Sequence, residues 1–594
     1  MLPSLRRRSR TQAGVHGQRR TARAVDRPHQ IRAPRHPPDL RPDGLRRRRR
    51  RLGDRRRRAP PSRGLRSGRR GRRHRLGRRR SRGGPVVTAP TSPLVVAVDC
   101  STTAAKAIVV DAAGRVLGAG SRPLETSSPV PHWFEQDGTQ WWTATDAAIT
   151  AALQEIPDRS AVVAICATHQ RESFVCLDGN GEPMRPAILW MDGRAEAEVR
   201  AYGSERVELL SGKPADITPG LYKLLWLRDH EPDTMARCRR IADVHTYLVH
   251  TMTGRWVSST ASVDPLAVID QRTGDYSDEL LALAGLRRDQ LPELVTTGTT
   301  IGPLRPDIAD AWGVGHDVAV VAGTGDGQAG GIGLGVTDPG AAYLVLGTAV
   351  VIGSETKSYV PARAYRSMIS AMPGQSTVET FSSSGTYLTT WFRREFGDPS
   401  LAGAPDPALE RAAAALPIGS ERLLTLPYWN GAQTPHWDGQ ASGVTLGWQG
   451  CHTRAHFYRS LLEGIALELR LQLDGLESAR GERVEVIRAT GGGARSALWT
   501  QILADVFDRP LQVCASAEVS ALGAAAIALT AAGVHDTLPA AAASVSITDA
   551  VVTPRPDAAA AYRHLRELYE RVFVHTRDLL HALHRSPLAK EDTP

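Results

Sequence analysis

Two β-hairpins of similar construction constrain the fold of this 594-residue chain more than any other feature of its sequence. In LVVAVDCSTTAAKAIVVD (94–111), two apolar strands flank a short turn of small and hydroxyl residues, and AAYLVLGTAVVIGS (341–354) repeats that arrangement. Thr103 and Thr348, one in each turn, lie 245 residues apart. Either turn alone is explained as well by an ordinary hairpin. The repetition, however, predicts a duplicated architecture with a cleft between its halves.

The two turns also have a composition that suits phosphate binding. A tight turn of Thr, Ser and Gly exposes backbone N–H groups and hydroxyls, which suit phosphate oxygens at close approach. After the first hairpin, DAAG (111–114) predicts a further turn and RVLGAGS a third strand, which together make a β-meander. A chain of this length exceeds what one hydrophobic core usually supports, so we expect at least two domains.

The net charge of +12 hides two very different parts of the chain. Residues 1–90 contain 32 Arg, no Lys and 4 Asp, whereas the remaining residues carry a net charge of −16. The first part has too few apolar residues to fold, so we expect residues 1–86 to be a disordered, arginine-rich head. One interpretation of the head is a nucleic-acid-binding arm. We favour a second, a mis-assigned start, in which the head is translated upstream sequence and the protein begins at Val86 or Val87.

Cysteine usage and hydropathy predict a cytoplasmic location without a membrane partner. The cysteines have no CxxC spacing, so reduced thiols are expected rather than a zinc site or a disulfide framework. They are Cys100, Cys166, Cys176, Cys238, Cys451 and Cys514. The longest apolar run, ALGAAAIALTAAG (521–533), is too short to span a bilayer and predicts a buried helix. The N-terminal residues lack the apolar segment of a secretory signal.

One carboxylate, Asp326, stands among glycines in GTGDGQAG (323–330), directly after the apolar stretch HDVAVVA. A charge at the end of a core strand is costly unless it has a partner or a function. The alternatives are a catalytic group and a turn aspartate that caps the following helix. The stretch also matches GxGxxG, but no acidic residue for a ribose follows about 20 residues later, so a dinucleotide site is not expected.

A third glycine cluster lies in EVIRATGGGARSALWTQILADVF (485–507). Here an apolar strand runs into three glycines and then into a segment whose apolar residues recur at helical spacing. Glycines at this point let a flat ligand lie against the backbone. The signal is weak alone, because strand–glycine–helix turns are common in α/β proteins.

Taken together and in order, these segments resemble the FGGY carbohydrate kinases of the actin–hexokinase–Hsp70 superfamily, from about residue 94 to about residue 575. In the N-terminal part, the resembling segments are the first hairpin, HWFEQDGTQWW (132–142) and THQRESFVCLDGNGEPMRPAILWMDGRA (168–195), the last of which resembles the sugar-site hairpin. GTGDGQAGGIGLG resembles the segment of the catalytic aspartate, and LGTA (346–349) resembles the second phosphate turn. The C-terminal domain with its adenosine site is represented by LPYWNGAQTPHWD (426–438), HTRAHFYRSLLEGIALELR (452–470) and GGGARSALWTQILADV (491–506).

The resemblance implies an α/β fold of two ribonuclease-H-like (actin-like ATPase) domains with an interdomain cleft. The domains are expected at about 93–335 and 341–580, each with a mixed sheet between helices. The expected enzyme transfers the γ-phosphate of ATP, with Mg²⁺, to a hydroxyl of a small sugar or polyol, and its domains close on the ligand.

The resemblance also implies roles for individual residues. Asp326 matches the general base that takes a proton from the attacking hydroxyl, and Asp99 matches the position that handles Mg²⁺. Arg171, Glu172 and Trp190 match sugar ligands, although a surface ion pair and a core tryptophan are the alternatives for them. The positions expected to bind ATP are Thr102, Thr103, Lys106, Gly347, Thr348, Gly385, Gly492, Gly493 and Ser496.

Several departures from the family pattern leave the acceptor open. Arg171–Glu172 stands where the xylulose-kinase branch often has Met-His, and this pair looks more like the glycerol-kinase branch. That branch, however, has a tyrosine where this chain has Thr218. Ser101 replaces the usual glycine of the first phosphate turn, and Gly327 replaces a larger polar residue. D-xylulose is the first expectation for the acceptor; glycerol, a tetritol or another ketose are the alternatives.

Two hypotheses from other functional classes compete with the kinase. Nucleic-acid binding through the arginine head predicts an affinity that falls steeply with salt and is lost without the head. We do not expect a nucleic-acid partner. A catalytically silent sugar sensor is the second, and the presence of Asp99, Thr103, Asp326 and Thr348 speaks against it. The sequence leaves the oligomeric state open, with a homodimer as one alternative.

Overall fold

The computed structural model describes residues 92–514 and 516–586, and Val87–Pro594 cluster as one compact unit. The arginine-rich head at 1–86, with its expected disorder and its two proposed start residues, lies outside the described residues.

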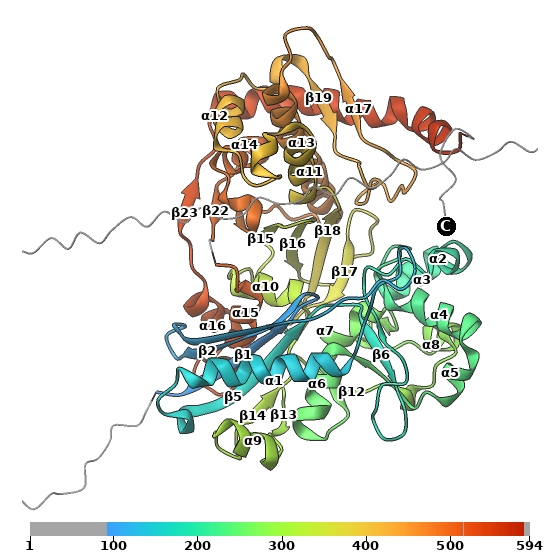
Figure 1. The fold of residues 1–594 in the computed structure, drawn as a ribbon, viewed down its shortest axis with the longest axis vertical. Helices are drawn as coiled ribbons and strands as arrows, with labels where there is room; N and C mark the ends of the chain where they lie inside the picture. The colour runs from blue at the N-terminus through green and yellow to red at the C-terminus, as the bar shows by residue number, and fades with distance from the viewer. Residues whose placement is uncertain (1–91, 515, 587–594) are drawn as a thin grey trace, which may run out of the picture. The chain divides into compact units, whose positions relative to one another are not determined.

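The meander predicted near the start of the acidic part opens a mixed sheet, the first sheet (Figure 1). In spatial order its strands are β13 (Thr300–Pro303), β14 (Ala319–Val321), β5 (Val162–His169), β1 (Leu94–Cys100), β2 (Ala104–Asp111) and β3 (Val116–Pro123). β1, β2 and β3 pair antiparallel, as the meander predicts, whereas β5 runs parallel to β1 and β14 runs parallel to β5.

The second hairpin opens another mixed sheet, the second sheet. In spatial order its strands are β17 (Arg366–Ile369), β18 (Ser376–Ser382), β16 (Val350–Thr356), β15 (Ala341–Leu346), β21 (Val486–Thr490), β22 (Leu511–Val513) and β23 (Ala550–Val552). β15, β16 and β18 form the antiparallel meander, and β21 and β22 follow in parallel beside β15. Four strands of each sheet share one order, β5-β1-β2-β3 in the first and β21-β15-β16-β18 in the second, and the predicted duplicated architecture is confirmed.

Helices cover both faces of each sheet. The α-helices are α1 (Thr139–Gln154), α2 (Glu196–Tyr202), α3 (Glu205–Ser211), α4 (Gly220–His230), α5 (Pro232–Arg237), α6 (Val244–Thr253), α7 (Thr260–Val263), α8 (Asp278–Ala284), α9 (Pro306–Trp312), α10 (Asp326–Gly333), α11 (Thr386–Phe396), α12 (Pro407–Ala414), α13 (Arg454–Arg480), α14 (Ala497–Phe507), α15 (Val519–Ala531), α16 (Leu538–Val545) and α17 (Pro556–His584). Short 3₁₀ helices lie at Arg159–Ala161, Asp264–Leu266, Arg288–Gln290, Pro399–Leu401, Ser420–Arg422 and Gly492–Arg495.

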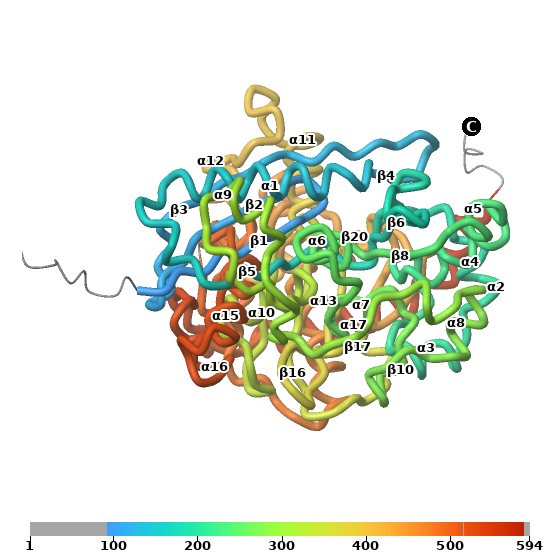
Figure 2. Tube along the Cα trace, turned by 90° about the horizontal axis from the view of Figure 1, so that it is seen from below, coloured from blue at the N-terminus to red at the C-terminus, as the bar shows by residue number. Residues whose placement is uncertain are grey.

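Alternate side chains of β1 enter different cores, as the pleat of a strand requires. Val96 and Val98 pack with residues of α1, α6 and α9, whereas Val95 and Ala97 pack with α15 and α16. Figures 1 and 2 show α15 and α16, in red, beside the blue strands of the first sheet. Helices from the end of the chain therefore cover a sheet built from its beginning.

α10 and α15 lie between the two sheets (Figure 1). The sequence of α15 is apolar on all sides, as expected of a helix that is buried from more than one direction. The prediction of a buried helix in the longest apolar run is confirmed. On its other face the second sheet packs against α13 and α14 in a large apolar core.

Smaller sheets complete the described part of the chain. A sheet of short strands contains β4 (Glu135–Gln136), β7 (Ala187–Ile188), β6 (Phe174–Leu177) and β8 (Arg240–Asp243). Three two-stranded pairs are β10 (Ile269–Asp270) with β11 (Asp275–Tyr276), β9 (Val257–Ser259) with β12 (Glu293–Val295), and β19 (Leu424–Leu426) with β20 (Val444–Leu446). The cysteines are free thiols. None of the helices in the described ranges is both long and apolar enough to cross a bilayer.

Candidate active site

Asp326 is the first residue of α10, at the point where the chain leaves β14 of the first sheet. Its Oδ1 lies 3.0 Å from Nε of Arg171 and accepts a hydrogen bond of 2.8 Å from the backbone N–H of Gly327. The N-cap position belongs to Gly325 rather than to Asp326. The Asp326 side chain is 38% exposed, although the strand and helix around it are buried. One carboxylate oxygen thus accepts an N–H of the first turn of α10, while the side chain stays accessible.

The glycines on either side of Asp326 make room for the arginine that contacts it. A Cβ at Gly325 would lie 2.5 Å from Cγ of Arg171, and a Cβ at Gly327 would lie 2.8 Å from Nη2 of the same side chain. Larger residues at these two positions would displace the guanidinium. The glycine-rich surroundings of Asp326 are thus explained by the close passage of Arg171.

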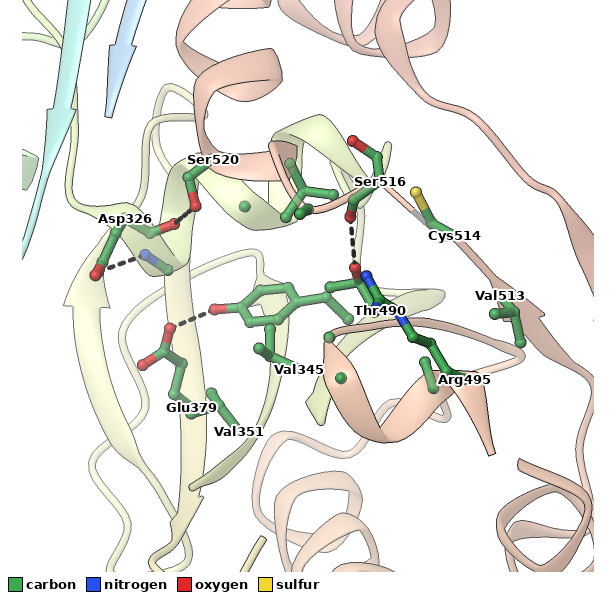
Figure 3. A pocket seen from close by; sticks show the side chains of 18 of the residues that line it. Asp326, Val345, Val351, Glu379, Thr490, Arg495, Val513, Cys514, Ser516 and Ser520 are labelled. Carbon is green, nitrogen blue, oxygen red and sulfur yellow. Dashed lines mark hydrogen bonds between the residues drawn. The ribbon is translucent and has the colours of Figure 1, made fainter. Parts of the chain in front are cut away.

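Asp326 faces a cavity of about 420 Å³ between α10, the start of α15 and the second sheet (Figure 3). Asp326 and Glu379 lie at one end of this cavity, and Thr490 and Arg495 at the other. The cavity therefore extends from Asp326 to the predicted glycine cluster after β21.

The first predicted phosphate turn joins β1 and β2. Ser101, which stands where glycine is usual, donates a hydrogen bond of 2.8 Å to the carbonyl of Ala104 and has no left-handed backbone angle. The turn therefore tolerates a side chain at this position. Thr103 is exposed at the tip, whereas Oγ1 of Thr102 donates to Oε1 of Gln170 at 3.2 Å. Lys106 lies in β2 and forms an ion pair of 3.1 Å with Glu518.

Asp99 is the second-last residue of β1, next to this turn, and is half-buried, with its Oδ1 enclosed. Burial, together with the charge of Asp326, raises the pKa of Asp99 to about 7, although Lys106 opposes the shift. Its Oδ1 has no hydrogen-bond partner among the described residues. A buried carboxylate oxygen without a partner, close to a second carboxylate, fits the hard oxygen ligands that Mg²⁺ prefers.

The described residues contain no cluster of three or more His, Cys, Asp and Glu side chains that could hold a metal ion. Mg²⁺ usually binds through one or two carboxylates, substrate phosphates and water rather than a protein cage, so the environment of Asp99 fits the ion that the resemblance implies.

The second predicted phosphate turn joins β15 and β16, and Thr348 is exposed at its tip. The N–H groups of Gly385 and Thr386, at the start of α11, donate to the carbonyls of Thr348 and Gly347 at 3.1 and 2.8 Å. A Cβ at Gly385 would lie 2.5 Å from the carbonyl oxygen of Gly347. Gly385 thus supports the turn from behind and is not among the described residues that line the 420 Å³ cavity.

The predicted adenosine residues line a second cavity, of about 700 Å³. Gly492, Gly493 and Ser496 form one wall, and Thr386 and Glu410 contribute to the others. Ser496 caps α14 by accepting the N–H of Trp499 at 3.0 Å. The two cavities share Gly492 and Arg495, so the glycine cluster lies between them.

Arg171 and Glu172 lie just beyond the end of β5 and are both buried, so the surface ion pair that was their alternative is wrong. Glu172 has a φ of 59°, a left-handed conformation that is rare for this residue type. Each side chain pairs with the second sheet, Arg171 with Glu379 at 2.9 Å and Glu172 with Arg366 at 3.2 Å. Burial raises the pKa of Glu172, and Arg366 and Arg171 oppose that shift.

Trp190 connects this pair to the first phosphate turn. Its Nε1 donates to Oγ1 of Thr102 at 3.0 Å, and its backbone N–H donates to Oγ of Ser173 at 3.1 Å. The indole is half-buried rather than part of the apolar core.

Several residues around this site escaped the sequence analysis. Gln136 and Gln170 hydrogen-bond to Thr102 and to each other, and Gln170 lies within a segment that the resemblance already included. Glu379 and Arg366 come from the second sheet and pair with Arg171 and Glu172, and Tyr343 of the same sheet donates a hydrogen bond to Glu379. A charged residue in the middle of a core strand, as in STVETFS, was the available signal for Glu379.

Comparison with known proteins places these features in a family. The model of the N-terminal domain of the FGGY family of carbohydrate kinases matches residues 94–333, and the model of the C-terminal domain matches residues 342–532. The chain is 32% identical to a xylulose kinase of Escherichia coli over 490 residues, which are 81% of this chain and 98% of that protein.

A glycerol kinase of Bordetella parapertussis is 29% identical over 461 residues, or 75% of this chain and 90% of that protein. Among solved structures, a xylulose kinase from Rhodospirillum rubrum matches with a TM-score of 0.77 and 28% identity, over 82% of this chain and 100% of that one.

Proposed function

The chain belongs to the FGGY family of carbohydrate kinases, and we propose that the acceptor of its phosphate is D-xylulose. Members of this family are two-domain enzymes of the actin-like ATPase fold, so the chain is an ATP-dependent sugar kinase. D-xylulose is supported by 32% identity to a xylulose kinase along almost the whole length of that protein. The boundaries of about 93–335 and 341–580 are our proposal for the two domains.

Asp326 carries the proposed mechanism, because its partly exposed carboxylate faces the cavity that extends to the glycine cluster. Arg171 and the N–H of Gly327 hold Oδ1, and Oδ2 has no hydrogen-bond partner among the described residues. We assign Oδ2 as the atom that accepts the proton of the attacking hydroxyl. The hydroxyl oxygen then bonds to the γ-phosphorus, the bond to the bridging oxygen breaks, and ADP leaves.

The nucleotide is proposed to lie between the two turns. Thr102, Thr103 and Lys106 would hold the β- and γ-phosphates from one side, and Gly347 and Thr348 from the other, because hydroxyls and backbone N–H groups at tight turns suit phosphate oxygens. Gly492, Gly493 and Ser496 would receive the adenosine in the 700 Å³ cavity, with Gly385 supporting the neighbouring turn.

Asp99 is the proposed residue for Mg²⁺, directly or through water. The ion would offset phosphate charge while the acceptor attacks. The unpartnered Oδ1 and its raised pKa support this assignment, since a nearby cation would favour the charged form that burial disfavours.

Arg171, Glu172 and Trp190 are proposed to bind the acceptor. The arginine offers donors, the glutamate offers acceptors, and the indole offers a flat apolar face. A short polyol such as glycerol is a second candidate acceptor. The Arg–Glu pair, which looks like the glycerol-kinase branch, and the 29% identity to a glycerol kinase favour it. A cytoplasmic location, a homodimer and the lack of a nucleic-acid partner stay predictions.

Turnover of a panel of ketoses, aldoses and polyols with Mg-ATP tests this function, with ADP release as the readout. We expect turnover with D-xylulose and a loss on the order of a thousandfold or more in Asp326→Asn, with ATP binding kept. Asp307→Asn, an exposed aspartate of α9, is the matched control. Turnover of glycerol and of no other panel member would identify glycerol, instead of D-xylulose, as the acceptor. Equal activity of Asp326→Asn and wild type would remove Asp326 from the chemistry. No turnover by a folded protein that binds ATP would favour the sensor.

A further inference from the structure

Glu379 is a buried carboxylate that lines the same cavity as Asp326 but comes from the other sheet. It lies in the middle of β18, and its side chain has no exposed surface. A charge at such a position is costly unless strong partners compensate it. Arg366 and Tyr343 on other strands of the second sheet, together with Arg171, provide them.

The partners of Glu379 form a continuous chain of polar contacts that ends at Asp326. The hydroxyl of Tyr343 donates to Oε1 at 2.5 Å, and Nη1 of Arg171 lies 2.9 Å from Oε2. Nη2 of Arg366 also lies 2.9 Å from Oε2. The same guanidinium of Arg171 then holds Oδ1 of Asp326 through Nε. Burial would raise the pKa of Glu379, but Arg171 and Arg366 lower it to about 2, so it is charged at neutral pH.

The residues that form this series of polar contacts come from both sheets. Arg171 follows β5 and Asp326 follows β14 of the first sheet, whereas Glu379, Tyr343 and Arg366 belong to strands of the second. The orientation of Arg171 therefore depends on how the second sheet lies against the first. If the two parts move apart, the contact between Arg171 and Glu379 breaks.

Gly327 leaves the space in which Arg171 and Glu379 meet. A Cβ at Gly327 would overlap Oε1 of Glu379 and would lie 2.8 Å from Nη2 of Arg171. Any side chain at this position would occupy the place where the arginine and the glutamate meet. The absence of a side chain at residue 327 and the ion pair are therefore matched to each other.

We propose that Glu379 is a positioning residue, which fixes Arg171 and through it directs Asp326 toward the acceptor hydroxyl. The inference rests on the proposed function of Asp326 and extends it to a residue of the second sheet. Glu379 transfers no proton and touches no reacting atom; it sets the direction in which Oδ2 of Asp326 points. Because a misplacement of about 1 Å costs on the order of a hundredfold in rate, such control matters for turnover.

Three variants of the full chain test the proposal. Glu379→Gln keeps the shape and removes the charge that orients Arg171. Gly327→Ala keeps every charge and inserts a methyl group between Arg171 and Glu379; in a helix, alanine is also the more stable residue. Glu355→Gln is the control, because Glu355 is buried on the same sheet and bonds to Thr377 at 2.9 Å, with no ion pair to Arg171.

We expect kcat to fall about 10- to 100-fold in Glu379→Gln and in Gly327→Ala, while KM for ATP changes by less than about threefold. The double variant should lose little more than the poorer single variant, because both changes disrupt one contact. Glu355→Gln should keep the wild-type kcat. A merely structural role for Glu379 would lower the melting temperature without this selective loss of kcat.

Wild-type kcat in a folded Glu379→Gln, or in Gly327→Ala if the first variant does not fold, would overturn the proposal. Multiplied losses in the double variant would overturn it as well. These outcomes leave the kinase activity of the wild type and the defect of Asp326→Asn intact, so they are distinct from a failure of the proposed function. If Asp326→Asn were fully active, Asp326 would need no positioning and both proposals would fall together.

Discussion

Nζ of Lys106 lies 3.1 Å from Oε1 of Glu518, and this ion pair joins β2 of the first sheet to the residue just before α15. Lys106 is one of the residues proposed to hold ATP phosphates, so a negative side chain occupies the place where a phosphate would be attracted. Both side chains are about one-third exposed, at 31% and 36%. An exposed pair of this kind contributes little stability, so a multiply charged phosphate can compete for the ammonium.

Glu518→Gln should therefore bind ATP more tightly. Removal of the competing carboxylate frees Lys106, and we expect KM for ATP to fall about two- to tenfold, with stability changed by less than about 1 kcal/mol. Steady-state kinetics at low and high salt measure the effect, which should shrink as salt screens it. Glu482→Gln, which breaks the Lys357–Glu482 pair elsewhere, is the control. A higher KM for ATP in Glu518→Gln would mean that Glu518 helps to bind the nucleotide.

Gly385→Ala should weaken nucleotide binding without touching the nucleotide. The new Cβ would lie 2.5 Å from the carbonyl of Gly347 and 2.7 Å from that of Thr348, so the second phosphate turn must shift. We expect KM for ATP to rise about tenfold or more, because the turn can no longer present its N–H groups in place. Titration with ATP checks this. Gly450→Ala is the control, because a Cβ at Gly450 meets open space. Gly374→Ala is unsuitable as a control, because Gly374 has a positive φ. Unchanged affinity in Gly385→Ala would separate this turn from ATP.

Trp190→Phe should affect both substrates because Trp190 contacts the first phosphate turn. The variant keeps an aromatic ring but loses the hydrogen bond of 3.0 Å from Nε1 to Thr102. A neutral hydrogen bond of this kind is worth about 1 kcal/mol, so we expect kcat/KM to fall about fivefold. Thr102→Val removes the same bond from the other side, and the double variant should lose little more than either single one. Fully additive losses would show that the two residues act independently.

The sheets were predictable because their signals are local. Each hairpin shows two apolar runs around a short turn, and the meander after the first follows from residues 111–121 alone. The duplication of strand order follows from these two hairpins. By contrast, the position of α15 against the first sheet depends on contacts between residues more than 400 positions apart, and no local pattern encodes them.

In the candidate site, too, the features with a local sequence signal were predictable and the long-range contacts were not. Asp326 and the turns were identified from short motifs, because their chemistry lies in adjacent residues. The partners of Arg171 and Glu172 were not identified, since two oppositely charged residues that are adjacent in the sequence suggest an ion pair with each other. In the structure the left-handed backbone at Glu172 turns both side chains toward the second sheet, where Glu379 and Arg366 pair with them. A pairing across two sheets becomes visible only once the fold is known.

Glu468 should make the stability of the protein depend on pH. This carboxyl lies in α13 with 2% exposure and accepts hydrogen bonds from the hydroxyls of Tyr428 and Tyr569 at 2.8 and 2.6 Å. Burial raises its pKa from an ordinary value of 4.5 to about 7, although the tyrosines oppose the shift. The folded state thus holds this proton more tightly than the unfolded state. The stability that results is complete below pH 4.5 and is lost as pH rises through 7.

The wild type should therefore lose on the order of 3 kcal/mol through this group between pH 4.5 and pH 8. Glu468→Gln keeps a neutral side chain of the same shape, so its stability relative to the wild type should improve as pH rises across that window. Urea unfolding at pH 5, 6, 7 and 8 measures the difference. Glu477→Gln, on the same helix, provides a control whose stability relative to the wild type should not change across that window. Although burial disfavours its charge, hydrogen bonds from Arg509 at 2.6 Å and from the backbone N–H of Val484 lower the pKa of Glu477. The stability that this lowered pKa provides is complete above pH 4.5 and is lost only at lower pH, so the cost of Glu477→Gln should stay nearly constant from pH 5 to pH 8. A difference between Glu468→Gln and wild type that stays constant from pH 5 to pH 8 would mean that Glu468 does not titrate in this window.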